Sequence, residues 1–241
     1  MKKRFLGLIL VFILAMAMNI SVYAADDSIP DMPMAGTYEY YSYFYNGASN
    51  ALITDRNGNN FTDFFVSNTK EYFANHDLKS IKKFKADNGL VSHLFYEVIS
   101  PIQPFAYEQY KTVYDTLEDN YTDTKYGTSM DFACKLSGGM WYNPNTYQIT
   151  RVAKPTFTTL YAMPPSGITP SVNEITTGSN IVNGKAYFWA HFQITGEGFI
   201  DGHYFDCYDY GSHTISFVSV KSSALKFNPI HAKLEKTQKA N

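Results

Sequence analysis

The spacing of short β-forming runs between turn residues in the second half of the chain most constrains its fold. From about Thr128 onward, runs rich in Thr, Tyr, Phe, Ile and Val are separated by turn pairs such as Gly138-Gly139 and Asn183-Gly184. The predicted strands are 129–136, 140–142, 146–153, 156–162, 172–176, 185–195, 199–208 and 213–220. Closely spaced strands favour antiparallel pairing, so residues 126–228 are predicted to form an antiparallel β-sandwich or a partly closed barrel.

Residues 36–125 are predicted to form a smaller α+β portion. Together with the β domain that follows it, the chain is predicted to be mainly β (α+β). Three runs rich in β-formers, at 37–45, 51–54 and 61–66, are predicted to form a meander because Asn-Gly pairs separate them. A helix is predicted after Asp77, a good N-cap, and a strand at 90–99 follows it.

A second helix is predicted from about Pro104 to Tyr121. Apolar residues recur there at intervals of three and four positions, namely Ala106, Tyr110, Val113, Leu117 and Tyr121. Five charged residues between them are predicted to face away from this stripe: Glu108, Lys111, Asp115, Glu118 and Asp119. A domain boundary is placed between residues 125 and 126.

The N-terminus carries the three-part pattern of a secretory signal peptide. Lys2, Lys3 and Arg4 precede an apolar run from residue 5 to residue 18, and Val22 and Ala24 are small residues at the expected cleavage positions. The apolar run is too short to span about 30 Å of hydrocarbon comfortably. We therefore expect residues 1–24 to be removed, residues 25–35 to form a flexible leader, and the mature chain to be secreted without a transmembrane segment.

The charge balance argues against nucleic-acid binding. The chain has 22 acidic and 20 basic residues, and three of the basic ones lie in the signal peptide, so the mature body is mildly acidic. Residues 221–241 contain five lysines and one glutamate. The basic tail, 229–241, is predicted either to contact anionic envelope surfaces weakly or to be solvated without a role.

Two cysteines, Cys134 and Cys207, are predicted to form a disulfide because an even cysteine count is typical of exported proteins with bridges. Phe132 and Leu136 flank Cys134 at alternate positions, so Cys134 is predicted to point inward. The alternative is a pair of buried free thiols.

No standard catalytic motif is present. The chain lacks the nucleophile-elbow, zincin, phosphate-loop and dinucleotide signatures. The densest polar stretch contains His191, Glu197, Asp201, His203, Asp206, Asp209 and His213. Within it, His191, His203 and Asp206 are the catalytic candidates for a small secreted hydrolase, although a structural or solvated role is the preferred interpretation. No metal and no cofactor are predicted.

The aromatic content is the unusual feature of the composition, with 20 Tyr, 18 Phe and 2 Trp. Most of these side chains should fill the core, but exposed ones could bind sugars or a protein. The candidate binding residues are Tyr41, Tyr43, Tyr45, Trp141, Tyr142, Tyr208 and Tyr210. The leading hypothesis is a secreted, non-enzymatic module that binds an extracellular glycan or protein; the alternatives are the hydrolase and an envelope-associated structural protein without a small ligand.

Overall fold

The structure is a computed structural model that describes residues 32–99, 107–122, 129–164, 167–200, 203–217 and 228–229. For residues 200, 203, 205–209, 228 and 229 it describes the backbone alone. The predicted signal peptide, residues 25–31 of the predicted leader and the tail after residue 229 lie outside the described residues. Three helices and ten strands occur in the described part of the chain, and none of these helices is long and apolar enough to cross a bilayer.

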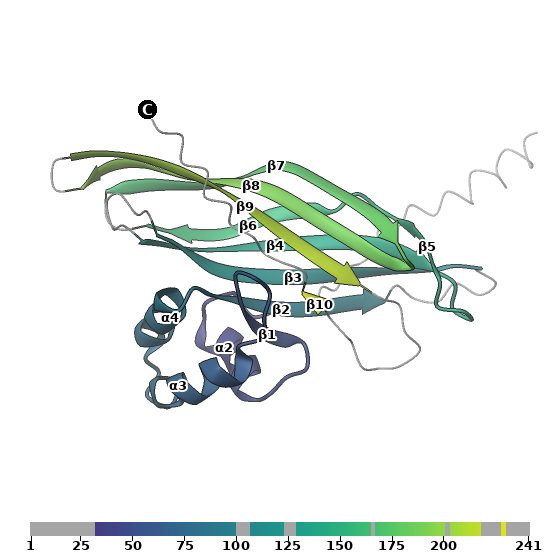
Figure 1. The fold of residues 1–241 in the computed structure, drawn as a ribbon, viewed down its shortest axis with the longest axis horizontal. Helices are drawn as coiled ribbons and strands as arrows, with labels where there is room; N and C mark the ends of the chain where they lie inside the picture. Colours follow the sequence, from purple (N-terminus) through teal and green to yellow (C-terminus); the bar gives the residue numbers. More distant parts are fainter. Residues whose placement is uncertain are drawn as a thin grey trace, which may run out of the picture. The chain divides into compact units, whose positions relative to one another are not determined.

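Two antiparallel sheets dominate the fold (Figure 1). The first sheet has the order β1-β2-β3-β4-β5, and β6 also pairs with β4. Its strands are β1 (Ala51–Asp55), β2 (Leu90–Ile99), β3 (Gln109–Thr122), β4 (Ser129–Tyr142), β5 (Ile149–Val152) and β6 (Thr156–Met163). The second sheet has the order β10-β9-β8-β7, formed by β7 (Ile168–Val182), β8 (Lys185–Ile200), β9 (His203–Phe217) and β10 (Asn228–Pro229).

The two sheets pack face to face and enclose two apolar clusters. In one cluster Val113 and Leu136 of the first sheet meet Phe188 of the second. In the other, Leu117 and Phe132 meet Phe192. The predicted mainly β class is confirmed, and the described strands are arranged as in a sandwich and not as a closed barrel.

Strand β3 replaces the second predicted helix. The residues that suggested a helical stripe, Val113, Leu117 and Tyr121, are four positions apart, so they also share one face of a strand. Strand β3 as a whole contains three Thr and three Tyr, which fit a pleated sheet well. Pairing with β2 and β4 along almost its whole length decided the outcome. Because β3 and β4 are neighbours in one sheet, the boundary placed at 125/126 falls inside that sheet.

The predicted N-terminal meander is also wrong, except for β1. Helix α2 (Tyr38–Tyr45) forms where the first strand was predicted, with the Thr37 side chain accepting a hydrogen bond from the Tyr40 backbone N–H. Its buried residues Tyr40, Tyr41 and Phe44 follow the helical spacing. Helix α3 (Thr62–Ala74) forms where the third strand was predicted, and a single bridge between Thr54 and Asn60 is all that remains of the hairpin.

Other local predictions are confirmed. Helix α4 (Leu78–Asp87) begins after Asp77, whose side chain accepts a hydrogen bond from the Ser80 backbone N–H. Asn183 and Gly184 both have positive φ, as a tight hairpin turn requires, and connect β7 to β8.

The pair Gly138-Gly139, predicted as a break between strands, lies inside β4 instead. A Cβ atom at Gly138 would stand 2.3 Å from Phe188 Cγ, so the glycine permits close packing of the two sheets.

The helices cover part of the outer face of the first sheet, beside β1 and β2 (Figure 1). A buried carboxylate, Glu118 of β3, holds the helices on the sheet. We call Glu118 and the residues that bind it the Glu118 cluster. Its other members are Lys82 and Lys85 of α4, Tyr41 of α2, Ser92 of β2 and Tyr161 of β6. Lys85 Nζ lies 2.9 Å from Glu118 Oε2, and both side chains are at most 3 % exposed. Charge pairing therefore supplements apolar packing between the helices and the sheet.

Candidate functional site

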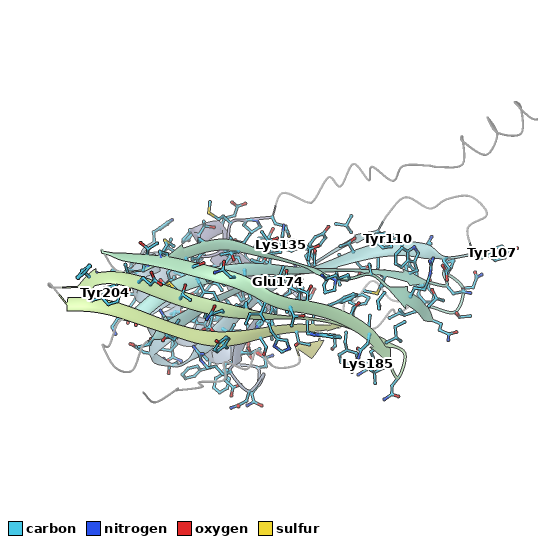
Figure 2. All side chains as sticks on the ribbon, turned by 90° about the horizontal axis from the view of Figure 1, so that it is seen from above. Tyr107, Tyr110, Lys135, Glu174, Lys185 and Tyr204 are labelled. Atoms are coloured by element: carbon cyan, nitrogen blue, oxygen red, sulfur yellow. The ribbon has the colours of Figure 1, made fainter. Side chains whose placement is uncertain are left out.

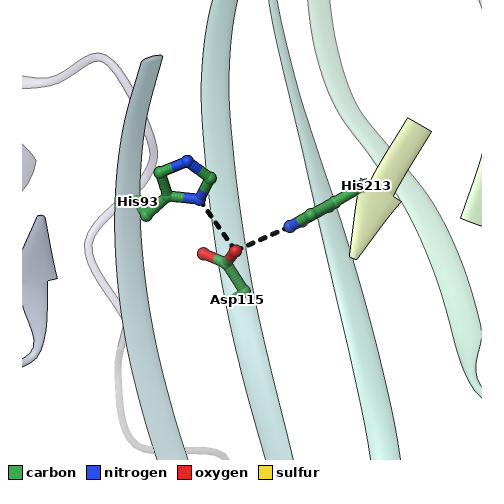
Figure 3. A group of neighbouring side chains, drawn as sticks. All are labelled: His93, Asp115 and His213. Atoms are coloured by element: carbon green, nitrogen blue, oxygen red, sulfur yellow. Dashed lines mark hydrogen bonds and ion pairs between the residues drawn. The ribbon is translucent and has the colours of Figure 1, made fainter. Parts of the chain in front are cut away.

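Three ionisable side chains converge between the sheets (Figure 3). His93 Nδ1 lies 2.9 Å from Asp115 Oδ2, and His213 Nε2 lies 2.6 Å from the same oxygen. All three side chains are at most 4 % exposed. We call this group the His–Asp–His centre; it links β2 and β3 of the first sheet to β9 of the second.

Strand alternation explains how each residue reaches the centre. On β2, Val91 and Phe95 belong to the apolar clusters between the sheets, and His93 shares their face. Asp115 likewise lies between Val113 and Leu117 on β3. On β9, His213 alternates with the buried residue Ile215. Each polar residue therefore occupies an inward position that the strand pattern normally gives to an apolar side chain.

The second ring nitrogen of each histidine also has a neighbour. Thr54 Oγ1 lies 3.4 Å from His93 Nε2, and Cys134 Sγ lies 3.9 Å from His213 Nδ1. In contrast, Asp115 Oδ1 is buried and has no hydrogen-bond partner among the described residues. An unpartnered buried acceptor is unfavourable in a folded protein, so native structures rarely leave an oxygen such as Asp115 Oδ1 without a partner.

The histidines control the charge of the carboxylate. Burial by itself raises the pKa of Asp115, but the nearby His93 and His213 oppose this effect and hold the pKa at about 2. The carboxylate is therefore ionised at neutral pH. A second carboxylate, Asp119, lies on the same strand face and pairs with Arg56 at 3.2 Å.

Cys134 is a free, buried thiol in the structure, which corrects the predicted disulfide. The inward orientation predicted for Cys134 is confirmed, but its sulfur faces His213. The strand register places Cys207 opposite Gly196, six residues along β9 from His213, which corresponds to about 20 Å of strand. That separation is far longer than the Cα–Cα distance of about 4.4 to 6.8 Å that a disulfide needs.

The arrangement Cys134–His213–Asp115 has the residue types of a nucleophilic triad but not its chemistry. Burial, reinforced by Asp115 and Asp119, raises the pKa of the Cys134 thiol well above its ordinary value. The thiol therefore stays protonated at neutral pH, and no bulky substrate reaches its sulfur in this conformation. The same burial keeps a substrate away from His93 and His213.

The predicted His191–His213 cluster is divided between the two faces of the second sheet. His191 is exposed on the outer face, whereas His213 pairs in register with Ala190 and points inward. The backbone places His203 opposite Ile200 and Asp206 opposite Glu197, but the side chains of His203 and Asp206 lie outside the described residues, as does Asp201.

The candidate aromatic residues are also divided. Tyr41 and Tyr142 are buried, which excludes them from a binding surface in this conformation: Tyr41 lies on a helix rather than on an exposed strand face, and Tyr142 points between the sheets. Tyr43 packs against Tyr96, and Tyr45 stacks on Phe73 with 3.9 Å between ring centroids.

Among the remaining candidates, Tyr210 is 37 % exposed on β9. The side chain of Tyr208 lies outside the described residues. Trp141 is partly exposed and stands in a row of three side chains on neighbouring strands.

That row, which we call the Trp141 platform, consists of Tyr110, Trp141 and Arg151. Tyr110 pairs in register with Trp141, and Trp141 with Arg151. The ring centroids of Tyr110 and Trp141 are 4.8 Å apart, and the Arg151 guanidinium lies 4.5 Å from the Trp141 ring. Arg151 also donates a hydrogen bond to Glu108. Figure 2 shows Tyr110 and the strongly exposed Tyr107 on the side of the long axis opposite to Tyr204.

Sequence reasoning missed two of the three members of the His–Asp–His centre. His93 lies in a correctly predicted strand, where the pattern Val91-Ser-His93-Leu-Phe95 places a histidine between two apolar residues on one face. This alternation was a sequence signal for an inward-facing histidine. Asp115 was assigned to the solvent side of a helix, and this error removed it from consideration.

Comparison with known protein families, with curated protein sequences and with solved structures found no match.

Proposed function

We propose that this chain is a secreted, non-enzymatic module that binds an extracellular glycan or protein through the Trp141 platform. The observation that carries the proposal is the register of Tyr110, Trp141 and Arg151, which places two aromatic rings and a guanidinium side by side across three strands. The rings are partly exposed and the Arg151 side chain is 60 % exposed, so a partner can reach them.

The chemistry of the platform suits a glycan. Aromatic faces offer apolar surface to the C–H groups of a sugar ring, while Arg151 and Glu108 can hydrogen-bond its hydroxyl groups. Strand pairing fixes the spacing of the rings, so little conformational freedom is lost on binding. A protein partner would use the same residue types, because Trp, Tyr and Arg are the side chains that most often dominate interface energetics.

Secretion is part of the proposal and is supported by the N-terminal sequence pattern. The hydrolase alternative is less well supported. The side chains of the His–Asp–His centre are buried between the sheets, where a substrate does not contact them.

A tryptophan exchange tests the proposal. We expect the purified protein to bind one or more polysaccharides or extracellular proteins in an array screen, and Trp141→Ala to weaken that binding at least tenfold. Trp189→Ala is the matched control, because Trp189 is also partly exposed but lies on β8 of the other sheet. Retained binding by Trp141→Ala, or an equal loss in both variants, would show that the platform is not the binding surface.

A further inference from the structure

We propose that the His–Asp–His centre binds a divalent first-row transition metal ion, with zinc as the reference ion. The donor atoms of His93, Asp115 and His213 all lie within 4.8 Å of one another. Two ligands bound to one tetrahedral ion at about 2.0 to 2.2 Å are separated by about 3.4 Å. Small side-chain movements therefore bring the three donors around one ion.

The histidines are oriented as metal ligands usually are. A ligating histidine normally donates its second ring N–H to a neighbouring acceptor, which fixes the orientation of the ring. Here Thr54 Oγ1 is placed to accept from His93 Nε2, and Cys134 Sγ to accept from His213 Nδ1. A hydroxyl and a thiol can each donate or accept, so both neighbours suit the metal-free and the metal-bound tautomers.

The unpartnered oxygen of Asp115 points to the same conclusion. The carboxylate receives both histidines on Oδ2, while Oδ1 is buried without a partner in the described part of the chain. A bound ion that uses Oδ1, alone or together with Oδ2, would remove the cost of that orphaned acceptor.

The donor types select the class of ion. Two imidazoles and one carboxylate suit zinc, iron and related transition metals, whereas Ca²⁺ and Mg²⁺ prefer six or more oxygen ligands. Cys134 faces the nitrogen of His213 that points away from Asp115, so it acts as a neighbour of the ligand and not as a ligand. Because the centre joins both sheets inside the core, the ion would stabilise the folded state.

Metal titration tests the proposal directly. Tag-free protein is treated with a chelator, dialysed, and titrated with ZnCl₂ or CoCl₂. We expect one ion per chain, a rise in Tm with Zn²⁺, and the visible absorption of tetrahedral Co²⁺ without a sulfur-to-cobalt charge-transfer band. Failure of the wild-type protein to bind either ion stoichiometrically would overturn the proposal, and a strong sulfur-to-cobalt band would overturn the ligand set.

Substitutions identify the site. Asp115→Asn and His213→Ala should each weaken Zn²⁺ binding at least tenfold, while His191→Ala should leave it unchanged because His191 lies on the outer face of the same sheet. Cys134→Ser should retain binding. If the core variants do not fold, NMR of ¹⁵N-histidine-labelled wild-type protein decides: Zn²⁺ should shift two of the six histidines. Loss of binding in His191→Ala, or shifts confined to solvent-exposed histidines, would contradict the assignment.

Discussion

Removing the charge of Glu118 should destabilise the protein more than any surface substitution. Glu118→Gln keeps the size of the side chain but leaves Lys85 buried at 3 % exposure without its nearest counter-charge. Breaking a buried ion pair from one side costs about 3 to 5 kcal/mol. Tyr41 and Tyr161 donate to different oxygens of Glu118, so Gln can accept from one of these hydroxyls and donate its NH2 to the other. We therefore expect the lower end of this range, about 3 kcal/mol, or a fall in Tm of about 6 to 12 °C.

The partner substitution should cost less, because Glu118 keeps other partners. In Lys85→Met the carboxylate still faces Lys82 at 3.5 Å and accepts hydrogen bonds from two tyrosines. The double variant, Glu118→Gln with Lys85→Met, should be more stable than the sum of the single losses predicts. A coupling free energy of about 1 to 3 kcal/mol is expected for such a pair.

Urea unfolding followed by tryptophan fluorescence and circular dichroism provides the free energies of unfolding. The matched control is Lys83→Met on the same helix, since Lys83 and Asp87 form a pair whose side chains are 71 % and 57 % exposed. That change should cost less than about 0.5 kcal/mol. The reasoning is refuted if Glu118→Gln costs less than about 1 kcal/mol, or if the two single losses simply add.

Burial raises the pKa of Glu118, but Lys85 and Lys82 lower it to about 2 from the ordinary 4.5. The ionised carboxylate should therefore contribute about 3 kcal/mol of stability above pH 5, and this contribution should be lost as the pH falls toward 2. Unfolding measured across this acid range should show a smaller loss of stability in Glu118→Gln than in the wild-type protein. Gly138→Ala should lower the free energy of unfolding by about 1 to 3 kcal/mol because the new methyl group meets the Phe188 ring. Adding Phe188→Leu should recover part of this loss in denaturant unfolding. An unchanged unfolding midpoint in Gly138→Ala would contradict the close packing. In a Cys207→Ser variant, Cys134 should react with a thiol reagent only as fast as the protein unfolds, because burial shields the sulfur and raises the pKa of the thiol. Rapid labelling of the native protein would show that the core is open.

Local sequence signals predicted those elements whose residues favour one structure. The Asp77 cap and the spacing of Leu78, Ile81 and Phe84 predicted helix α4 correctly. The Asn183-Gly184 pair predicted its hairpin, because few other dipeptides accept positive φ at both turn positions. Most strands after residue 128 were recognised from their composition and their flanking turns.

Elements with ambiguous periodicity were predicted wrongly. Apolar residues four positions apart satisfy both a helix and a strand, which is why β3 was assigned to a helix. The tyrosine-rich segment at 37–45 is dense in β-formers, yet its residues Tyr40, Tyr41 and Phe44 also form a helical face. In both segments tertiary packing decided the structure: β3 is paired on both sides, with β2 and β4, and Tyr41 of α2 reaches Glu118, 77 residues away.

The sequence by itself determined that this chain forms a mainly β protein, where several of its turns lie, and that Cys134 points inward. The tertiary structure alone decided that Cys134 faces a histidine, that Trp141 stands in line with Tyr110 and Arg151, and that His93 and His213 meet one carboxylate. His93 and Asp115 are 22 residues apart, and Asp115 and His213 are 98 apart. Contacts over such separations depend on the pairing and stacking of whole sheets, which no local pattern of residues specifies.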